Sequence, residues 1–145
     1  MKLLFYILLV VMLGGCATTH PDTLMREQFE KLPQKYSQFD FKLAWDNKVS
    51  DDVVIVDGMV WNARWYHADG LEIWVSLIAP DGSVLAKGVD LIRPDTIKLG
   101  EISPFLIKLH ARSVPGSKLM FSYKYSAVEN NEHSMTWLQS FEAGL

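Results

Sequence analysis

Apolar and polar residues alternate along most of the chain after Phe39, in short runs separated by turn residues. In residues 39–46 every second side chain is aromatic or Leu, which is typical of a strand with one face in the core. Further strand-like runs lie at residues 53–61, 71–77, 84–91, 105–110, 121–126 and 135–141. Residues 53–61 are apolar at nearly every position, which predicts a central strand covered on both faces.

These segments predict about seven strands, with turn signals such as Pro80-Asp81-Gly82 and Pro115-Gly116 between them. The expected fold class is therefore all-β: an immunoglobulin-like antiparallel β-sandwich. The only cysteine is Cys16, so no disulfide joins the predicted sheets. We assign residues 39–145 to this one domain. The 130 residues from Cys16 onward are enough for one domain that buries close to 70% of the surface that its unfolded form exposes.

The segment before the domain, residues 16–38, is expected to be a short helical or irregular tether. The apolar residues spaced as on one face of a helix are Met25, Phe29, Leu32 and Tyr36. Pro33 predicts that this helix ends near Leu32, because proline disrupts a helix interior.

Residues 1–15 have the organisation of a secretory signal peptide. Lys2 precedes eleven apolar residues, Leu3 to Leu13, and two glycines follow them. A bilayer-spanning helix needs about 17 to 25 apolar residues, so this run is too short to span. The pattern predicts that the segment is removed.

The segment Leu13-Gly14-Gly15-Cys16 resembles the lipobox of bacterial lipoproteins, in which an aliphatic and two small residues precede an obligatory cysteine. The resemblance implies cleavage before Cys16, a diacylglyceryl thioether on its sulfur and acylation, commonly by palmitate, of the new amino terminus. The protein is then expected to be lipid-anchored in a bacterial cell envelope. In a bacterium with two membranes, Ala17 in place of Asp implies the outer membrane, with the protein facing the periplasm.

A second resemblance covers roughly residues 53–125. The motifs Gly58-x-Val60-x-Asn62, Asp81-Gly82-x-Val84 and Pro104-Phe105 are similar to those of FxLYD-type immunoglobulin-like domains of bacterial envelope proteins, especially small lipoproteins. The naming motif is degraded to Val75-Ser76-Leu77-Ile78-Ala79, in which only the central Leu is kept. This resemblance implies the fold and no particular activity.

Composition and spacing argue against several functions. The net charge is −3, or −4 once Lys2 is removed with the signal, and no basic block occurs, so we expect no nucleic acid partner. The histidines, none at metal-ligand spacing, are His20, His67, His110 and His133. There is no Gly-x-Ser-x-Gly motif, and lipidation would consume Cys16. We therefore predict no metal site, no cofactor and no enzymatic activity.

One aromatic cluster at the end of a predicted strand is the best candidate for binding. Its members are Trp61, Arg64, Trp65 and Tyr66. Aromatic rings beside a guanidinium could stack on a sugar or a peptide. In the alternative interpretation, which we favour, Trp61 continues a buried face and Trp65 plugs the end of the sandwich. The expected function is a non-catalytic module that binds another envelope protein; the alternative is an accessory protein that binds a glycan or small ligand through this cluster.

Overall fold

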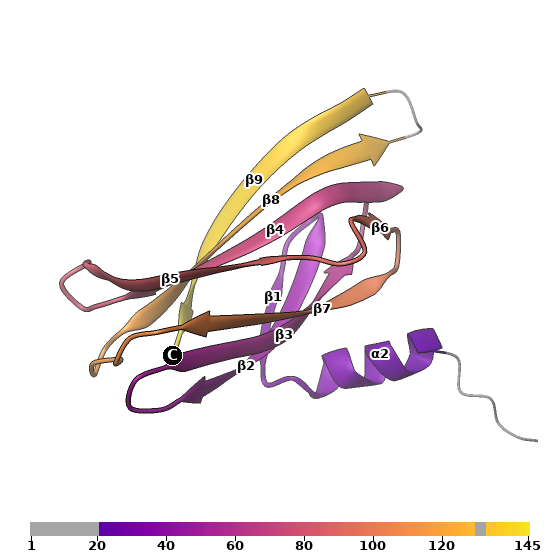
Figure 1. The fold of residues 1–145 in the computed structure, drawn as a ribbon. Helices are drawn as coiled ribbons and strands as arrows, with labels where there is room; N and C mark the ends of the chain where they lie inside the picture. Colours follow the sequence, from indigo (N-terminus) through magenta and orange to yellow (C-terminus); the bar gives the residue numbers. More distant parts are fainter. Residues whose placement is uncertain (1–20, 130–132) are drawn as a thin grey trace, which may run out of the picture.

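The computed structural model describes residues 21–129 and 133–145, so the predicted signal segment and Cys16 lie outside the described residues. Figure 1 shows two packed layers of strands with one helix beside them. The elements are α2 (Pro21–Lys31), β1 (Gln34–Ser37), β2 (Phe41–Val49), β3 (Val54–Asn62), β4 (His67–Ile78), β5 (Val84–Leu91), β6 (Thr96–Lys98), β7 (Ile102–Leu109), β8 (Lys118–Glu129) and β9 (His133–Gly144). Within these residues no helix is long and apolar enough to cross a membrane.

The strands form two antiparallel sheets, which confirms the predicted immunoglobulin-like sandwich. The first has the order β1-β2-β3-β7 and the second the order β5-β4-β8-β9. The short strand β6 pairs with β4 beyond the end of β5. At that change of partner the β4–β8 register shifts between Asp69 and Glu72, where Gly70 has a φ of 59°, a conformation that favours glycine.

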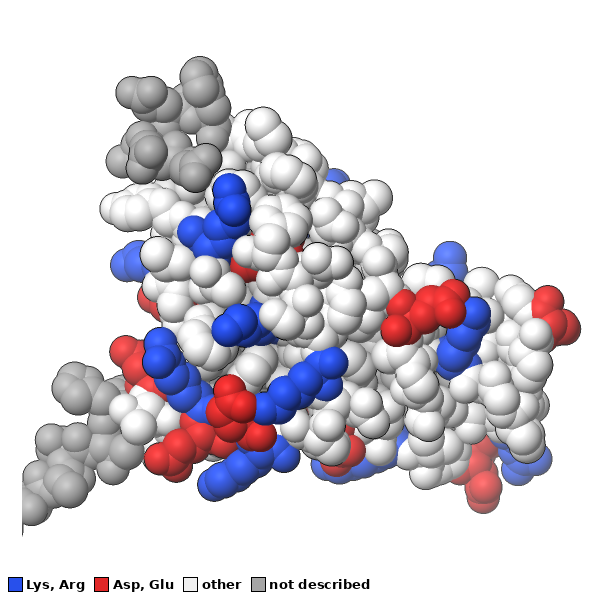
Figure 2. Space-filling view, turned by 180° about the vertical axis from the view of Figure 1, so that it is seen from behind, with Lys and Arg blue, Asp and Glu red and all other residues white. Residues whose placement is uncertain are grey.

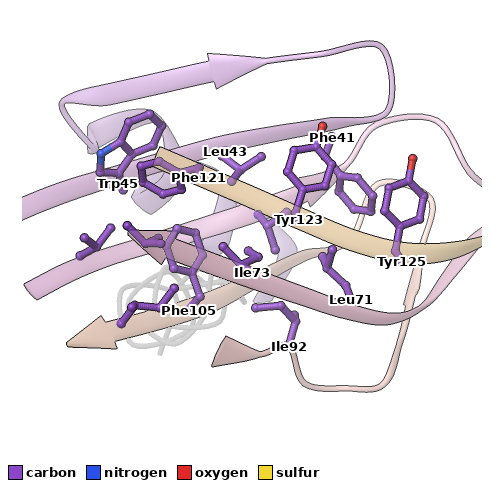
Figure 3. Close-up of a cluster of buried hydrophobic side chains, with 14 of the residues drawn as sticks. Phe41, Leu43, Trp45, Leu71, Ile73, Ile92, Phe105, Phe121, Tyr123 and Tyr125 are labelled. Atoms are coloured by element: carbon purple, nitrogen blue, oxygen red, sulfur yellow. The ribbon is translucent and has the colours of Figure 1, made fainter. Parts of the chain in front are cut away.

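The core fills the space between the inner faces of the two sheets. Because side chains alternate across a strand, every second residue is buried along β3, along β7 and along β8, and also along β4 beyond its register shift. Figure 3 shows this layer, in which Trp45 and Phe41 of one sheet face Phe121 and Tyr125 of the other. The rings of Phe41 and Tyr125 meet edge to face with centroids 4.8 Å apart, an arrangement that aromatic pairs prefer.

Helix α2 lies on the outer face of the sheet β1-β2-β3-β7 (Figure 1). Phe29 is its buried residue, and its ring meets the ring of Trp61 in β3 at 5.7 Å and 86°. The outer face of β3 is thus covered only in part. Met59 is half-buried, whereas Asp57 is exposed. The prediction of a strand covered on both faces is right for its inner face and only partly right for its outer face.

All seven predicted strand segments are strands, but the region before them differs from expectation. Tyr36 is not on the helix: it lies in β1, which pairs with β2, and its ring stacks on Phe141 at 3.5 Å. The sheet therefore includes part of the segment expected to be a tether. Phe39 and Asp40 precede β2 and break the predicted alternation, with Phe39 exposed and Asp40 buried.

Candidate functional site

The four residues of the predicted aromatic cluster point in different directions. Trp61 is half-buried on the outer face of β3, beneath helix α2. The guanidinium carbon of Arg26 and the ammonium of Lys42 lie 4.8 and 4.6 Å from the centre of a Trp61 ring. Both distances are within the range of a cation–π interaction. Trp61 is therefore the surface on which α2 docks.

Trp65 is a core residue with 5% of its surface exposed. Its indole Nε1 donates a hydrogen bond to the Tyr125 hydroxyl at 2.9 Å. It cannot stack on a ligand in this position. The favoured interpretation, in which Trp65 plugs the end of the sandwich, agrees with this burial.

A polar network lies directly beneath Trp65. The hydroxyls of Tyr123 and Tyr125 donate to the two carboxylate oxygens of Asp40 at 3.0 and 2.5 Å, and the backbone N–H of Phe41 donates to Oδ1 at 2.7 Å. Figure 3 shows the two tyrosine rings side by side with their hydroxyls pointing the same way. Asp40 has no exposed surface, so these three donors replace the water that a free carboxylate would bind.

Burial raises the pKa of both tyrosines above the ordinary value. For Tyr123 the negative charge of Asp40 is the next cause, and for Tyr125 it is the hydrogen bond to Asp40. Both hydroxyls therefore remain protonated donors across the physiological pH range.

Asn62 fixes the loop between β3 and β4, and it has no exposed surface. Its Nδ2 donates to the carbonyls of Trp65 and Ile97 at 3.0 and 2.9 Å, and its Oδ1 accepts from the N–H groups of Trp65 and Arg64 at 3.0 and 3.2 Å. The side chain thereby replaces backbone pairing that the loop lacks. The sequence analysis did not predict this structural role for Asn62; an asparagine that ends an apolar strand is the signal that could have identified it.

The other two predicted residues are exposed. The guanidinium of Arg64 lies 4.9 Å from a Trp65 ring and 5.5 Å from the Phe39 ring. Tyr66 is 60% exposed and contacts His67, with ring centroids 5.5 Å apart. Of the four predicted cluster residues, the structure therefore brings together Arg64 and Trp65, and both of them lie beside Phe39.

The structure instead brings together Phe39, Arg64, Trp65 and Trp137, which we call the aromatic end. The Phe39 ring meets the rings of Trp65 and Trp137 at 6.4 and 5.6 Å, and the two indoles are 5.7 Å apart. Phe39 is 46% exposed and Trp137 half-buried. Sequence reasoning placed Phe39 and Trp137 on the inner faces of separate strands. Only the topology of the sandwich shows that they meet.

The geometry of the aromatic end suits a protein surface better than a sugar ring. The Phe39 ring is inclined at 79° to the Trp65 ring and at 65° to the Trp137 ring, so these three rings form no flat platform. A cation beside an exposed aromatic ring is a combination that recurs at protein–protein contacts.

Three grooves of the described surface lie elsewhere, beside α2. One, of about 580 Å³, separates the first turn of α2 from the turn after β6, and is lined by Asp22, Arg26, Lys98 and Glu101 among others. Its charges are of both signs, and none of the four predicted cluster residues lines it. Among residues 21–129 and 133–145, no three His, Cys, Asp or Glu side chains are grouped as a metal site requires.

No protein-family model and no curated protein matches the sequence. Among solved structures, the chain is similar to the GAE domain of GGA2p from Saccharomyces cerevisiae, with 13% identity and a TM-score of 0.51 over 76% of this chain and 96% of that one. It is also similar to the yeast GGA1 GAE domain, with 9% identity and a TM-score of 0.50 over 74% and 95% of the two chains. Likeness at this identity shows the β-sandwich fold alone.

Proposed function

We propose that the protein is a lipid-anchored component of a bacterial cell envelope, held to a membrane through Cys16, whose immunoglobulin-like domain is a non-catalytic module that binds another envelope protein. Membrane attachment and partner binding are separate parts of this proposal.

The observation that carries the anchor is the lipobox-like segment ending at Cys16, together with the position of α2. Only residues 17–20 separate Cys16 from Pro21, the first residue of the helix. Helix α2 packs on the sandwich through Phe29, so the connection between lipid and domain is the stretch of five residue steps from Cys16 to Pro21. Fully extended, this stretch spans about 17 Å. The domain would thus be held against the membrane and not extended from it.

The aromatic end supports the binding role. Contacts that contribute most to protein association are enriched in Trp, Tyr and Arg, and they cluster. Here the exposed Phe39 ring and the Arg64 guanidinium lie over a base fixed by the Trp65–Tyr125 hydrogen bond. A rigid base lowers the entropy lost when a partner binds. On the face in Figure 2, Lys and Arg side chains alternate with Asp and Glu and form no continuous basic surface, so a protein is favoured over nucleic acid.

The binding role is tested with the full chain in intact bacterial cells. A photo-crosslinking amino acid replaces Phe39, and in a matched chain it replaces Leu106, which is 49% exposed on β7. We expect a discrete protein adduct from position 39 only. Arg64→Ala should reduce this adduct severalfold, whereas Lys108→Ala, a change of an exposed cation elsewhere, should leave it unchanged.

Two results would contradict the proposed binding surface. One is the same set of adducts from positions 39 and 106. The other is a position-39 adduct that is insensitive to Arg64→Ala.

A further inference from the structure

Strand β9 forms an edge of the second sheet. It is twelve residues long and, in the described part of the chain, pairs only with β8. Residues 134–141 include no Lys, Arg, Asp, Glu or Pro, and the β8–β9 register has no shift. Natural sheets commonly protect their edges with charges, prolines or bulges. This stretch of β9 has none of these devices.

The other edges of the sandwich are short or covered. Strand β1 has four residues, with Lys35 among them. The edges β5 and β7 lie against each other, because Asp90 Oδ2 of β5 accepts from the N–H of Leu106 in β7 at 2.8 Å. A Cβ placed on Gly88 of β5 would lie 2.6 Å from Ile107 Cγ2, which shows how closely the two strands approach. Among the edge strands of residues 21–129 and 133–145, only β9 presents a long, unprotected edge.

The free backbone groups of β9 can be assigned from one hydrogen bond. Asn47 Nδ2, which belongs to the other sheet, donates to the carbonyl of Gly144 at 3.3 Å, so this carbonyl points away from β8. Backbone groups of alternate residues point to the same side of a strand. The N–H and C=O groups of Ser134, Thr136, Leu138 and Ser140 therefore also point away from β8, and they form a row ready to pair.

We propose that this row pairs with the same row of a second copy of the protein, antiparallel and centred on Trp137. In this register Thr136 lies opposite Leu138 of the second copy, and Ser134 lies opposite its Ser140. These pairs can exchange about eight backbone hydrogen bonds. The two Trp137 side chains then lie opposite each other, and aromatic pairs at such positions stabilise strand pairing.

Charge favours a second copy as the occupant. Two copies of a chain whose net charge is −4 once Lys2 is removed with the signal repel each other in general, but residues 134–141 of both are uncharged. Pairing these segments therefore places no like charges opposite each other. The aromatic end also continues across the contact, because Trp137 of each copy already packs on its own Phe39.

Membrane attachment of both copies is also compatible with this dimer, and this step rests on the proposed anchor. The two-fold axis of an antiparallel edge contact is perpendicular to the sheet, so rotation keeps the order of the layers. Helix α2 of each copy is then on the same side of the dimer, and both Cys16 lipids can enter one membrane. A contact of one strand pair is small, so it forms only when the copies are concentrated. Anchoring both copies in one membrane raises their effective concentration.

The test uses two full-length copies with different C-terminal tags, co-expressed and solubilised from the membrane fraction with detergent. We expect one copy to capture the other. Thr136→Lys with Leu138→Lys places cations opposite each other in the proposed register and should lower capture about tenfold. Thr136→Glu with Leu138→Lys places opposite charges there and should restore it. Both positions are exposed, so circular dichroism of the two variants should be unchanged.

A crosslinking arm locates the contact. A short bismaleimide should join two copies of the Leu138→Cys variant. The matched variant Val89→Cys, changed on β5, should not be joined. The unchanged chain controls for crosslinking through Cys16. Crosslinks from position 138 only to a different protein, or equal capture by both charge variants, would overturn the proposal. Membrane-bound chains that show no self-capture overturn the dimer and leave the anchor standing. Self-capture by chains found only in the soluble fraction overturns the anchor and leaves the pairing.

Discussion

The Tyr125 hydroxyl donates to the Asp40 carboxylate at 2.5 Å and joins the two sheets of the sandwich at its aromatic end. Tyr125 lies in β8 of the second sheet, and Asp40 directly precedes β2 of the first. The same hydroxyl accepts from the indole of Trp65. Because it both donates and accepts in a buried position, this one oxygen holds a carboxylate and a tryptophan in place.

Tyr125→Phe removes this oxygen and nothing else. Asp40 then loses one donor, and the Trp65 N–H is left without a partner, so the free energy of unfolding should fall by about 2 to 3 kcal/mol. Urea denaturation measures the change. Tyr66→Phe is the matched control, because its hydroxyl is on an exposed residue, and it should change stability by less than about 0.5 kcal/mol. Equal effects of the two substitutions would show that the network contributes little.

The tyrosines also predict a response to alkaline pH. Burial and the Asp40 charge raise the pKa of Tyr123 in the folded state above the ordinary tyrosine value of about 10. The unfolded chain then loses protons above about pH 10 that the folded chain keeps, so the free energy of unfolding falls as pH rises from there. Urea denaturation at pH 9 and 11 should show the fall, and Tyr123→Phe should reduce it. An identical decline in the variant would assign the effect to other groups.

Gly58 in β3 is expected to tolerate no side chain. A Cβ there would lie 2.5 Å from Phe105 Cζ and 2.6 Å from the carbonyl oxygen of Ala44, and a backbone oxygen of a paired strand cannot move aside freely. Gly58→Ala should lower the midpoint of thermal unfolding and cost about 2 to 3 kcal/mol. Gly144→Ala, where no heavy atom lies within 4 Å, is the control. A neutral Gly58→Ala would contradict the close packing of β2, β3 and β7.

The docking of α2 depends on Phe29. Phe29→Ala removes the buried ring that packs on Trp61, and the loss of about 2 kcal/mol should speed amide exchange in the helix about thirtyfold. Exchange in β4 and β8 should be unchanged, because they belong to the other sheet. Leu24→Ala, at a position 47% exposed, should leave helix exchange nearly unaffected. Faster exchange throughout the sheets would instead make α2 part of the folding core.

The long strands could be predicted because each turns one face toward the core, so that apolar residues recur at every second position of the sequence. β1 and β6 could not, since four and three residues are too few to show a period. They form because β2 and β4 offer free edges to pair with. The interruption of the alternating pattern at Phe39 and Asp40 could not be predicted either, because the tyrosines that stabilise the buried Asp40 lie more than 80 residues away in the sequence.

The candidate site was predictable only as a set of residue types. Trp61 and Trp65 both stand out as aromatic, but their directions depend on where β3 ends and on how Asn62 holds the next loop. Phe39 and Trp137 lie almost a hundred residues apart and meet through the sheet topology. No local pattern contains that information.

The claim that a lipid on Cys16 holds this domain at a membrane is tested most directly by the mass of the mature N-terminal peptide from the membrane fraction. We predict a chain that begins at Cys16, with the mass of a diacylglyceryl group on its sulfur. Cys16→Ser should leave the precursor uncleaved, and His20→Ala should be processed normally. A chain that begins at Met1 with an unmodified Cys16 would contradict the account.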